Sequence, residues 1–510
     1  MEHPIQCDCP KNNERMWTMF NEIVAKEEMK FKDLEGKIFK FVNMLGCLII
    51  KSILEKRDAQ IKQTRDKGKY RNKGARANTI KTIMGEVEYY RTRYLINEDG
   101  VSKYTYLLDE QMDINTIGKI SQNFVEALLE IVPKTDSYRK AEEVLKTTTG
   151  AVLSFEAIRT VVLEVGKKIT AKEKEEIELN KKGQLIAGDK DVVALFEEAD
   201  GIFINLQGKD RQEALEEQKK TKGEDEQTLK RKKVKKELKL HVMYEGWKEG
   251  DSRHSLVNKK YIAGMMKAKE IANLRDARVH RTYKEEGIKL RVLNGDGASW
   301  TKGITPKNGI YQKDLFHIMK AIKENVSEEY QGRIRNLITT KRYDEIYDNL
   351  QQLKYEEGGE ENAVKKLERL QAYLMEGLER YSDLVEVPEA PKGLEFRALG
   401  TQESHIFSKL EKRFCSGRKA FSIEGANALA KICVLSEKIS IDDIEAPLPI
   451  DTSIDDWIKE LEENAKRNKK ACRKEFVGKG DMGAKQSHSE FKFMKEIFKI
   501  KGFSGLRLSY

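Results

Sequence analysis

Apolar side chains recur every three or four residues over much of the chain, which is the spacing of one face of an α-helix. Residues 12–57, 107–170 and 311–382 show this pattern and are predicted to be helical almost throughout. The last of these stretches is much longer than an ordinary connection between two elements. It is therefore predicted to be an inserted helical subdomain.

Residues 79–94 instead alternate polar and apolar positions around a break at Gly85, which predicts a β-hairpin. The tyrosines and arginines of this segment could form a nucleic-acid surface. The alternative is a half-buried strand pair with one solvated face. A basic stretch from Lys56 to Arg76 precedes the hairpin, and its Gly and Asn content predicts an exposed arm.

From residue 190 onward, short apolar runs replace the helical spacing. VVALFEEAD predicts a strand, Gly201 a tight turn, and IFINLQ the returning strand. A highly charged excursion follows, and then KLHVMYEGW predicts a third strand. A helix near Met265–Arg281 leads to IKLRVLNGDGAS, the fourth strand. Three meandering strands, a helix and a fourth strand are the opening of a ribonuclease-H-like fold.

These patterns predict an α/β ribonuclease-H-like catalytic core with a helical insertion, preceded by a mainly α-helical DNA-binding region. The predicted parts are an N-terminal helical arm with the basic stretch and the hairpin (1–105), a helical, helix-turn-helix-like domain (106–185), the first part of the core (186–310), the helical insertion (311–392), the last part of the core (393–450) and a basic C-terminal tail (451–510).

A short helix, a Gly-containing turn and a Ser-capped helix are predicted between residues 137 and 168. SYRKAEEVL is the first helix, TTTGAV the turn, and SFEAIRTVVLEVGKK the second helix, which Ser154 is placed to cap. In a DNA-binding helix-turn-helix, Ser154 and Arg159 would lie near the start of the recognition helix. Ordinary helical hairpins show the same pattern, so both interpretations stay open.

The positive net charge makes nucleic acid a candidate partner. Lys and Arg number 95 against 85 Asp and Glu, a net charge of +10, and a basic run contains Lys230, Arg231, Lys232 and Lys233. Basic clusters bind polyanions because neutralised phosphates release their counterions. The most apolar segment, residues 38–54, is too short and too polar to span a bilayer. Without a signal-peptide pattern or paired cysteines, we expect a cytoplasmic, nucleoid-associated protein with no membrane contact.

Three carboxylates stand where rigid elements of the predicted fold would hold them. Asp200 ends the first strand, Asp296 ends the fourth, and Glu403 begins a helix. Asp-Gly turns would explain the two aspartates, and the helix dipole would explain the glutamate. Their order favours a single site, because the first and fourth strands of a ribonuclease-H-like sheet are neighbours. Carboxylates suit Mg²⁺ or Mn²⁺, and two such ions can clamp the oxygens of a phosphoryl transfer.

The segments EEADGIFINLQG, LNGDGASW, YQKDLFH and GTQESHIFSKLEKRF, in this order, resemble the motifs of bacterial insertion-sequence DDE transposases of the ISLre group. That group is more distantly related to the Mutator-like transposases, and the resemblance runs over most of the chain. It implies that Asp200, Asp296 and Glu403 are the catalytic acids and hold two Mg²⁺ or Mn²⁺ ions. Asp314 and His317 match the Asp-x-x-His pair of Mutator-like transposases. His317 is thus a candidate catalytic residue, and a purely structural pair is the alternative.

The resemblance implies a transposase that cleaves double-stranded DNA at the terminal inverted repeats of its element and joins the ends to target DNA. A homodimer or a higher oligomer is expected, because two ends must be joined. The basic run would hold backbone phosphates without reading bases. Two alternatives remain: a structure-selective nuclease of the same fold, and an inactive or repurposed DNA-binding protein. His405 departs from the family motif, in which Asn is common two residues beyond the glutamate, and this puts only local contacts in doubt.

Overall fold

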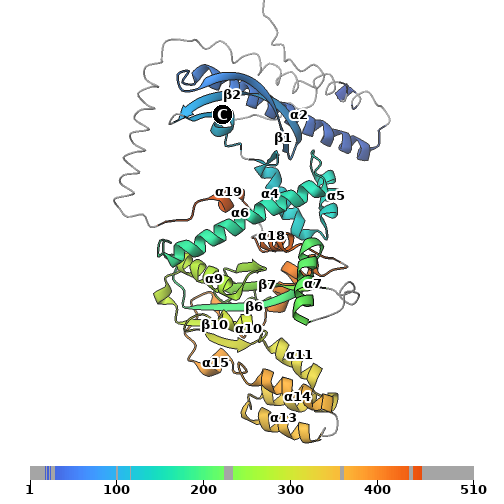
Figure 1. Cartoon of the computed structure of the whole chain (residues 1–510), viewed down its shortest axis with the longest axis vertical. Coiled ribbons are helices and arrows are strands. Elements are labelled where there is room, and N and C mark those ends of the chain that lie inside the picture. The colour runs from blue at the N-terminus through green and yellow to red at the C-terminus, as the bar shows by residue number, and fades with distance from the viewer. Residues whose placement is uncertain are drawn as a thin grey trace, which may run out of the picture. The chain divides into compact units, whose positions relative to one another are not determined.

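The fold is mixed α/β in the part of the chain that the computed structural model describes (Figure 1). Within these residues no helix is both long enough and apolar enough to cross a membrane. The described residues are 29–450, apart from 99–100, 115, 223–233, 357–360, 418 and 436–439, together with four residues between 18 and 23.

The N-terminal part combines one long helix with a five-stranded sheet of order β3-β2-β1-β5-β4. Helix α2 (Phe31–Thr64) packs against β2, which forms the predicted hairpin with β1. Side chains along β2 alternate between buried and exposed, with Tyr89 and Tyr94 fully buried. The half-buried strand pair is therefore confirmed. The strands are β1 (Arg71–Thr82), β2 (Gly85–Glu98), β3 (Val101–Thr105), β4 (Thr116–Ile117) and β5 (Ile120–Ser121).

The prediction of an exposed arm from Lys56 to Arg76 is wrong, because both ends of this segment have regular secondary structure. Its first part completes α2, and its last part opens β1. Regular pairing of the backbone N–H and C=O groups explains the difference, because it overrides a composition that only favours loops.

Helices dominate from residue 107 to 181, as the spacing predicts. Ser137 Oγ accepts a hydrogen bond from the backbone N–H of Lys140 at 3.1 Å, and Ser154 Oγ accepts one from Ala157 at 3.3 Å. The two serines therefore cap consecutive helices, as expected for good N-cap residues. These helices are α3 (Leu107–Gln111), α4 (Gln122–Ile131), the short 3₁₀ helix η1 (Val132–Lys134), α5 (Tyr138–Thr148) and α6 (Phe155–Lys181).

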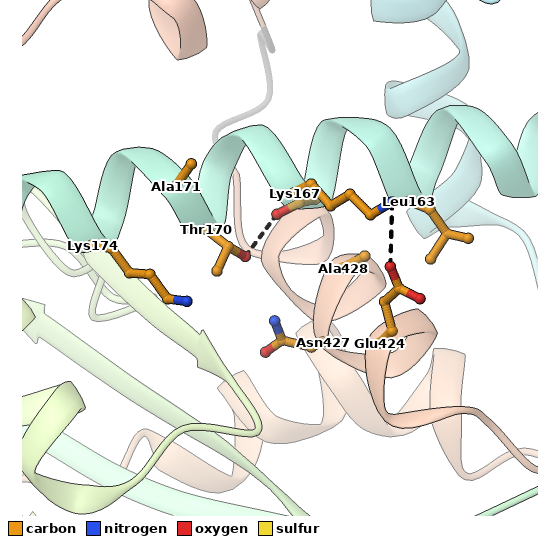
Figure 2. A pocket seen from close by; sticks show the side chains of 9 residues that line it. Leu163, Lys167, Thr170, Ala171, Lys174, Glu424, Asn427 and Ala428 are labelled. Carbon is orange, nitrogen blue, oxygen red and sulfur yellow. Dashed lines mark hydrogen bonds and ion pairs between the residues drawn. The ribbon is translucent and has the colours of Figure 1, made fainter. Parts of the chain in front are cut away.

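Helix α18 (Ile423–Cys433) lies against α6 at a contact between small residues. A Cβ on Gly166 would come within 2.3 Å of the Cβ of Ala428, so glycine is required there. Beside this contact the two helices line an open groove with a volume of about 340 Å³, shown in Figure 2. Lys167 and Glu424 pair across the groove at 3.5 Å. Since α18 also packs on the central sheet, it connects α6 to the core. A short helix, α19 (Ile441–Glu445), follows.

The central sheet has five strands in the order β11-β10-β6-β7-β9. Strand β7 is antiparallel to both of its neighbours, β6 and β9. On the other side of β6, strands β10 and β11 run parallel to it. Helix α9 (Ala268–Thr282) stands between β9 and β10 in the chain, close to the predicted helix. The strands are β6 (Ala194–Asn205), β7 (Lys235–Tyr244), β9 (Lys260–Gly264), β10 (Leu290–Gly295) and β11 (Ile310–Lys313).

The hairpin predicted at Gly201 is wrong. Strand β6 continues through Asp200 and Gly201, and β7 pairs with it from Phe196 to Asn205. Gly201 is needed for another reason, because a Cβ there would lie 2.7 Å from the carboxylate of Glu237 on β7. The long ladder outweighs the local turn signal, since it satisfies the backbone groups on that side of the strand.

The third antiparallel strand is β9 rather than a returning strand after Gly201. The apolar patterns missed β9 and β11 because each has only four or five residues. Helix α7 (Gly208–Lys222) occupies the first part of the predicted charged excursion, and Lys230, Arg231, Lys232 and Lys233 lie outside the described residues. Shorter elements nearby are β8 (Trp247–Lys248), the 3₁₀ helix η2 (Glu285–Gly287) and α10 (Ser299–Gly303).

The helical character predicted after β11 is confirmed. Ile322, Leu350 and Leu367 are fully buried members of a hydrophobic cluster that these helices make among themselves. The helices are α11 (Leu315–Asn325), α12 (Glu328–Thr339), α13 (Asp344–Glu356), α14 (Glu361–Leu374) and α15 (Tyr381–Leu384). After the two-residue strand β12 (Leu394–Glu395), a continuous helical run consists of α16 (Gln402–His405), the π-helical η3 (Ile406–Glu411) and α17 (Lys412–Phe414).

Candidate metal centre

Asp200 and Asp296 come from neighbouring parallel strands. Ala199 of β6 is the register partner of Gly295 of β10, so the residues that follow them, Asp200 and Asp296, stand at the same level of the sheet. Side chains at matching levels of adjacent strands point to the same face. Asp200 lies in the middle of β6, not at its end, while Asp296 comes directly after β10.

Asp296 begins the turn that enters α10. One carboxylate oxygen, Oδ1, accepts hydrogen bonds from the N–H of Ala298 at 2.9 Å and from the hydroxyl of Thr301 at 3.0 Å. The backbone carbonyl of Asp296 accepts a third hydrogen bond, at 2.8 Å, from the hydroxyl of Tyr373 on α14. The carboxylate is thereby fixed in orientation, and the helical insertion contacts the site through Tyr373.

Glu403 and His317 reach Asp200 from two other elements. Glu403 lies in α16, at the start of the helical run, and His317 lies in the first turn of α11. The Nε2 atom of His317 is 3.8 Å from Asp200 Oδ2 and 3.6 Å from Glu403 Oε1. One ligand atom from each of the three side chains lies within 4.8 Å of the other two. The structure therefore brings together residues that are 117 and 86 positions apart in the sequence (317 − 200 and 403 − 317).

Asp296 does not belong to this close group, which is the one metal-sized cluster of His, Cys, Asp and Glu found among the described residues. Its negative charge nevertheless raises the pKa of both Asp200 and His317. Asp200 and Glu403 thus lie together and Asp296 follows the neighbouring strand, while the role of the three acids as catalytic metal ligands stays a prediction. His317 occupies the position in the close group that was expected for Asp296.

Burial and neighbouring charges shift the pKa values of Asp200 and His317. Burial raises the pKa of Asp200 to about 7, and the charges of Asp296 and Glu403 add to this rise. Burial alone would lower the pKa of His317, but the hydrogen bond with Asp314 and the charge of Asp200 keep it above its ordinary value. A bound cation favours the ionised form of such carboxylates. Two carboxylates and an imidazole suit Mn²⁺, and the carboxylates suit Mg²⁺.

Asp314 fixes the orientation of the His317 ring. Its Oδ2 lies 3.1 Å from His317 Nδ1, and its Oδ1 accepts a hydrogen bond from Asn294 Nδ2 at 2.9 Å. Burial opposes ionisation of Asp314, yet these hydrogen bonds hold its pKa below the ordinary value. A carboxylate on one ring nitrogen commonly orients a histidine whose other nitrogen is used for binding. The predicted three-residue spacing therefore does bring both side chains together.

Glu198, which the sequence reasoning passed over, lies two residues before Asp200 and is fully buried. It accepts hydrogen bonds from the backbone N–H of Thr401 at 3.0 Å and from that of Gln402 at 3.2 Å. Burial raises the pKa of Glu198, and the donors around it oppose the rise. The sequence signal that could have found Glu198 is a pair of glutamates within an apolar strand. Glu is rarely fully buried without partners, so such a pair indicates specific contacts.

His405 turns away from the close group. Its Nδ1 is 3.1 Å from the hydroxyl of Tyr261 on β9. Burial lowers the pKa of His405 to about 4, so the ring is neutral near pH 7. The departure from the expected Asn thus has a local contact of its own, with Tyr261 of β9.

The residues predicted to bind DNA lie away from this group in the sequence. Ser154 uses its hydroxyl to cap α6, and Arg159 is exposed on the first turns of the same helix. Apolar side chains such as Ile158 and Val162 fill the opposite face of α6. The geometry is compatible with both the helix-turn-helix and the plain helical hairpin, so DNA binding at Arg159 stays a prediction.

The chain belongs to the uncharacterised protein family UPF0236, whose sequence profile matches residues 24–223 and 222–443. One similar relative is a UPF0236 protein of Caldanaerobacter subterraneus subsp. tengcongensis, 26% identical over 440 residues, which cover 83% of this chain and 81% of the relative. Its name joins four loci of one genome. Another from the same organism is 26% identical over 435 residues, covering 83% of this chain and 81% of that protein, and its name joins eleven loci.

Among solved structures, the Drosophila P element transposase strand transfer complex matches 66% of this chain and 83% of that chain. The sequence identity is 8% and the TM-score is 0.19. A TM-score this low carries no conclusion about fold or function.

Proposed function

We propose that this UPF0236 protein is a DDE-type DNA transposase of the ISLre kind, which cleaves DNA at the ends of its element and transfers the ends into target DNA. The proposal depends on one observation above all. A close group is formed by Asp200 from β6, His317 from α11 and Glu403 from α16. Asp296 follows the neighbouring strand β10, at the level of Asp200 in the sheet. Carboxylates gathered from rigid elements are what metal-dependent phosphoryl transfer requires.

The topology of the central sheet supports a ribonuclease-H-like core. Three antiparallel strands come first in the chain, a helix follows, and two parallel strands then extend the sheet beside the first strand. This order places the first and fourth strands next to each other, which is the arrangement expected for the two aspartates. The helical insertion after β11 interrupts the core before Glu403.

The repetition of the family within one genome also supports a transposable element. Relatives at eleven loci and at four loci of one organism share a single name each. An enzyme that inserts its own gene at new positions produces such copies, whereas a housekeeping nuclease is under no such pressure to multiply.

In the proposed mechanism, Asp200, Asp296 and Glu403 would hold two Mg²⁺ or Mn²⁺ ions. Such ions would supply a lower pKa for the attacking water or 3′-hydroxyl and positive charge beside the leaving oxygen. Asp314 holds Nδ1 of His317, so Nε2 faces the carboxylates, where it can bind the scissile phosphate or move a proton. Burial of Asp200 excludes water from one side of the site and strengthens its electrostatic interactions.

Double-stranded DNA is the proposed partner. Arg159 and the Ser154-capped start of α6 would contact the terminal repeats, and the basic run Lys230, Arg231, Lys232 and Lys233 would hold backbone phosphates. A homodimer or a larger assembly would bring two ends together.

The test combines labelled DNA ends that flank the gene with a supercoiled target plasmid and Mg²⁺ or Mn²⁺. Joined end–plasmid products are expected, and they should disappear with EDTA or in Asp296→Ala. Asp191→Ala is the control, because the Asp191 side chain is 82% exposed and pairs with Lys284. Cleaved ends without joined product would replace the transposase with a nuclease of the same fold. DNA binding without any cleavage would leave only a DNA-binding protein.

A further inference from the structure

Glu198 is a fully buried carboxylate on the catalytic face of the sheet. It stands two residues before Asp200 on β6, and side chains two residues apart on a strand point to the same face. Burying a carboxylate is unfavourable by several kcal/mol unless hydrogen-bond donors replace the lost water. The identity of those donors therefore indicates what the side chain does.

Five donor groups surround Glu198. Its Oε1 accepts from the hydroxyls of Thr401 at 2.5 Å and Tyr244 at 2.7 Å. Its Oε2 accepts from the backbone N–H groups of Thr401 at 3.0 Å and Gln402 at 3.2 Å, and from Asn294 Nδ2 at 3.3 Å. Three of these donors belong to the two residues directly before Glu403. Two of the three are backbone N–H groups at the start of the helical run, which have no partner inside the helix.

We propose that Glu198 is a positioning residue, which fixes the start of the Glu403 helix and so sets the affinity of the site for divalent ions. The proposal rests on the proposed function, in which Glu403 binds an ion. Charge-assisted hydrogen bonds to main-chain N–H groups hold the backbone itself, not only a side chain. Glu403 is the next residue along, so its distance to Asp200 and His317 depends on this anchor.

A second connection leads from the same carboxylate to His317. Asn294 Nδ2 lies within hydrogen-bond distance of both Glu198 and Asp314, at 3.3 Å and 2.9 Å. Asp314 in turn holds the ring of His317. Glu198 is thus connected to two of the three side chains of the close group without touching either of them. Partners of this kind typically change metal affinity by 10- to 100-fold when they are removed.

Glu197 offers a matched control. It is adjacent in sequence and equally buried, but it points to the opposite face of the sheet. There it pairs with His241 at 2.9 Å, Arg291 at 2.6 Å and Arg275 at 3.4 Å. Loss of either buried carboxylate should lower stability, since unpaired donors remain. Only the loss of Glu198 should weaken ion binding.

The experiment measures Mn²⁺ binding to the full chain by isothermal titration calorimetry, with no DNA and no turnover. We expect Glu198→Gln to raise the Kd for Mn²⁺ about tenfold and Glu197→Gln to leave it within about twofold of wild type. Thr401→Val, which removes one hydroxyl donor and keeps the backbone N–H, should raise the Kd by a smaller factor. Circular dichroism confirms that each variant is folded before titration.

The outcomes separate the two proposals. If Glu403→Gln weakens Mn²⁺ binding while Glu198→Gln binds like wild type, the positioning role is wrong and the proposed function stands. Equal weakening by Glu197→Gln and Glu198→Gln would also overturn the positioning role. If Glu403→Gln binds Mn²⁺ as tightly as wild type, the proposed metal centre itself is wrong. Should Glu198→Gln fail to fold, an unchanged Kd for Thr401→Val overturns the positioning role.

Discussion

Replacing Asp200 with asparagine should stabilise the metal-free protein at neutral and higher pH while removing its response to divalent ions. Burial disfavours the charged form of Asp200, and the nearby acids Asp296 and Glu403 add to this. Asparagine has nearly the same shape and no charge. Its side-chain oxygen can still accept the hydrogen bond from the N–H of Gly201, which is 2.6 Å long in the wild type.

The magnitude follows from the two pKa values of Asp200. The ordinary value is 3.8, and in the folded protein the pKa is raised to about 7. Each unit between the folded and unfolded values corresponds to about 1.4 kcal/mol, so above pH 7 the penalty is at most about 4 kcal/mol. Water that reaches the open side of the site screens part of it. We therefore expect Asp200→Asn to raise the free energy of unfolding by about 2 kcal/mol.

The sign depends on pH. Because the folded pKa of Asp200 is the higher one, the unfolded chain loses this proton first, and wild-type stability falls as the pH rises from about 4 to about 7. The raised pKa of His317 has the same pH sense, but its charged form stabilises the fold: this contribution is present at low pH and is lost as the pH rises through the folded pKa. Asp200→Asn loses part of that contribution. The variant should therefore be no more stable than wild type near pH 5 and more stable near pH 8.

The assay is urea unfolding in EDTA at about pH 5 and about pH 8, followed by thermal unfolding with and without Mn²⁺. An ion at one hundred times its Kd adds about 2.7 kcal/mol to the wild type, and Asp200→Asn should gain almost none of it. Asp191→Asn, whose carboxylate is 82% exposed, serves as the control and should change stability by less than about 1 kcal/mol. A variant less stable than wild type near pH 8, or a difference that does not change with pH, would refute the desolvation argument.

Three further predictions concern glycines and can be measured by urea unfolding. Gly201→Ala should destabilise the protein by about 1–3 kcal/mol, because the added Cβ would meet Glu237. In the double variant with Glu237→Ala, most of this destabilisation should disappear. A glycine that served only a turn would show no such coupling. Gly166→Leu should be more severe, since Ala428 leaves no space between α6 and α18, and near-wild-type stability would contradict that packing. Gly332→Ala, inside α12 with nothing within 4 Å of its Cβ, should stabilise by about 0.5–1 kcal/mol, and a loss of stability would show that the space is not open.

Much of the candidate site could be predicted from the sequence because its acids stand beside strong local signals. Apolar runs preceded Asp200 and Asp296, and a glycine and a helical pattern bracketed Glu403. The spacing of Asp314 and His317 on one helix face predicted their contact, which the structure has at 3.1 Å. What no local signal carried is that His317, rather than Asp296, would share the close group with Asp200 and Glu403.

Glu198 shows why the remaining contacts were beyond reach. Its donors come from β7, β10 and the start of α16 with the residue before it, at separations of 46 to 204 residues along the chain. A single sequence contains no information on such pairs unless the fold is already known. Glu198 was also difficult to distinguish from Glu197, because the direction of each side chain depends on the register of β6.

The sequence by itself determined the helices and their caps, since an amphipathic spacing and a serine at the start act within a few residues. Ser137 and Ser154 cap the helices that the pattern predicts, and the alternation of β2 fixes which of its side chains are inside. Tertiary structure decided the rest. The Asp200-Gly201 pair favours a turn when considered alone, and pairing with β7 makes it the middle of a twelve-residue strand instead. A ladder of backbone hydrogen bonds outweighs the preference of two residues, and the parallel pairing of β6 with β10 on the other side sets Asp200 beside Asp296.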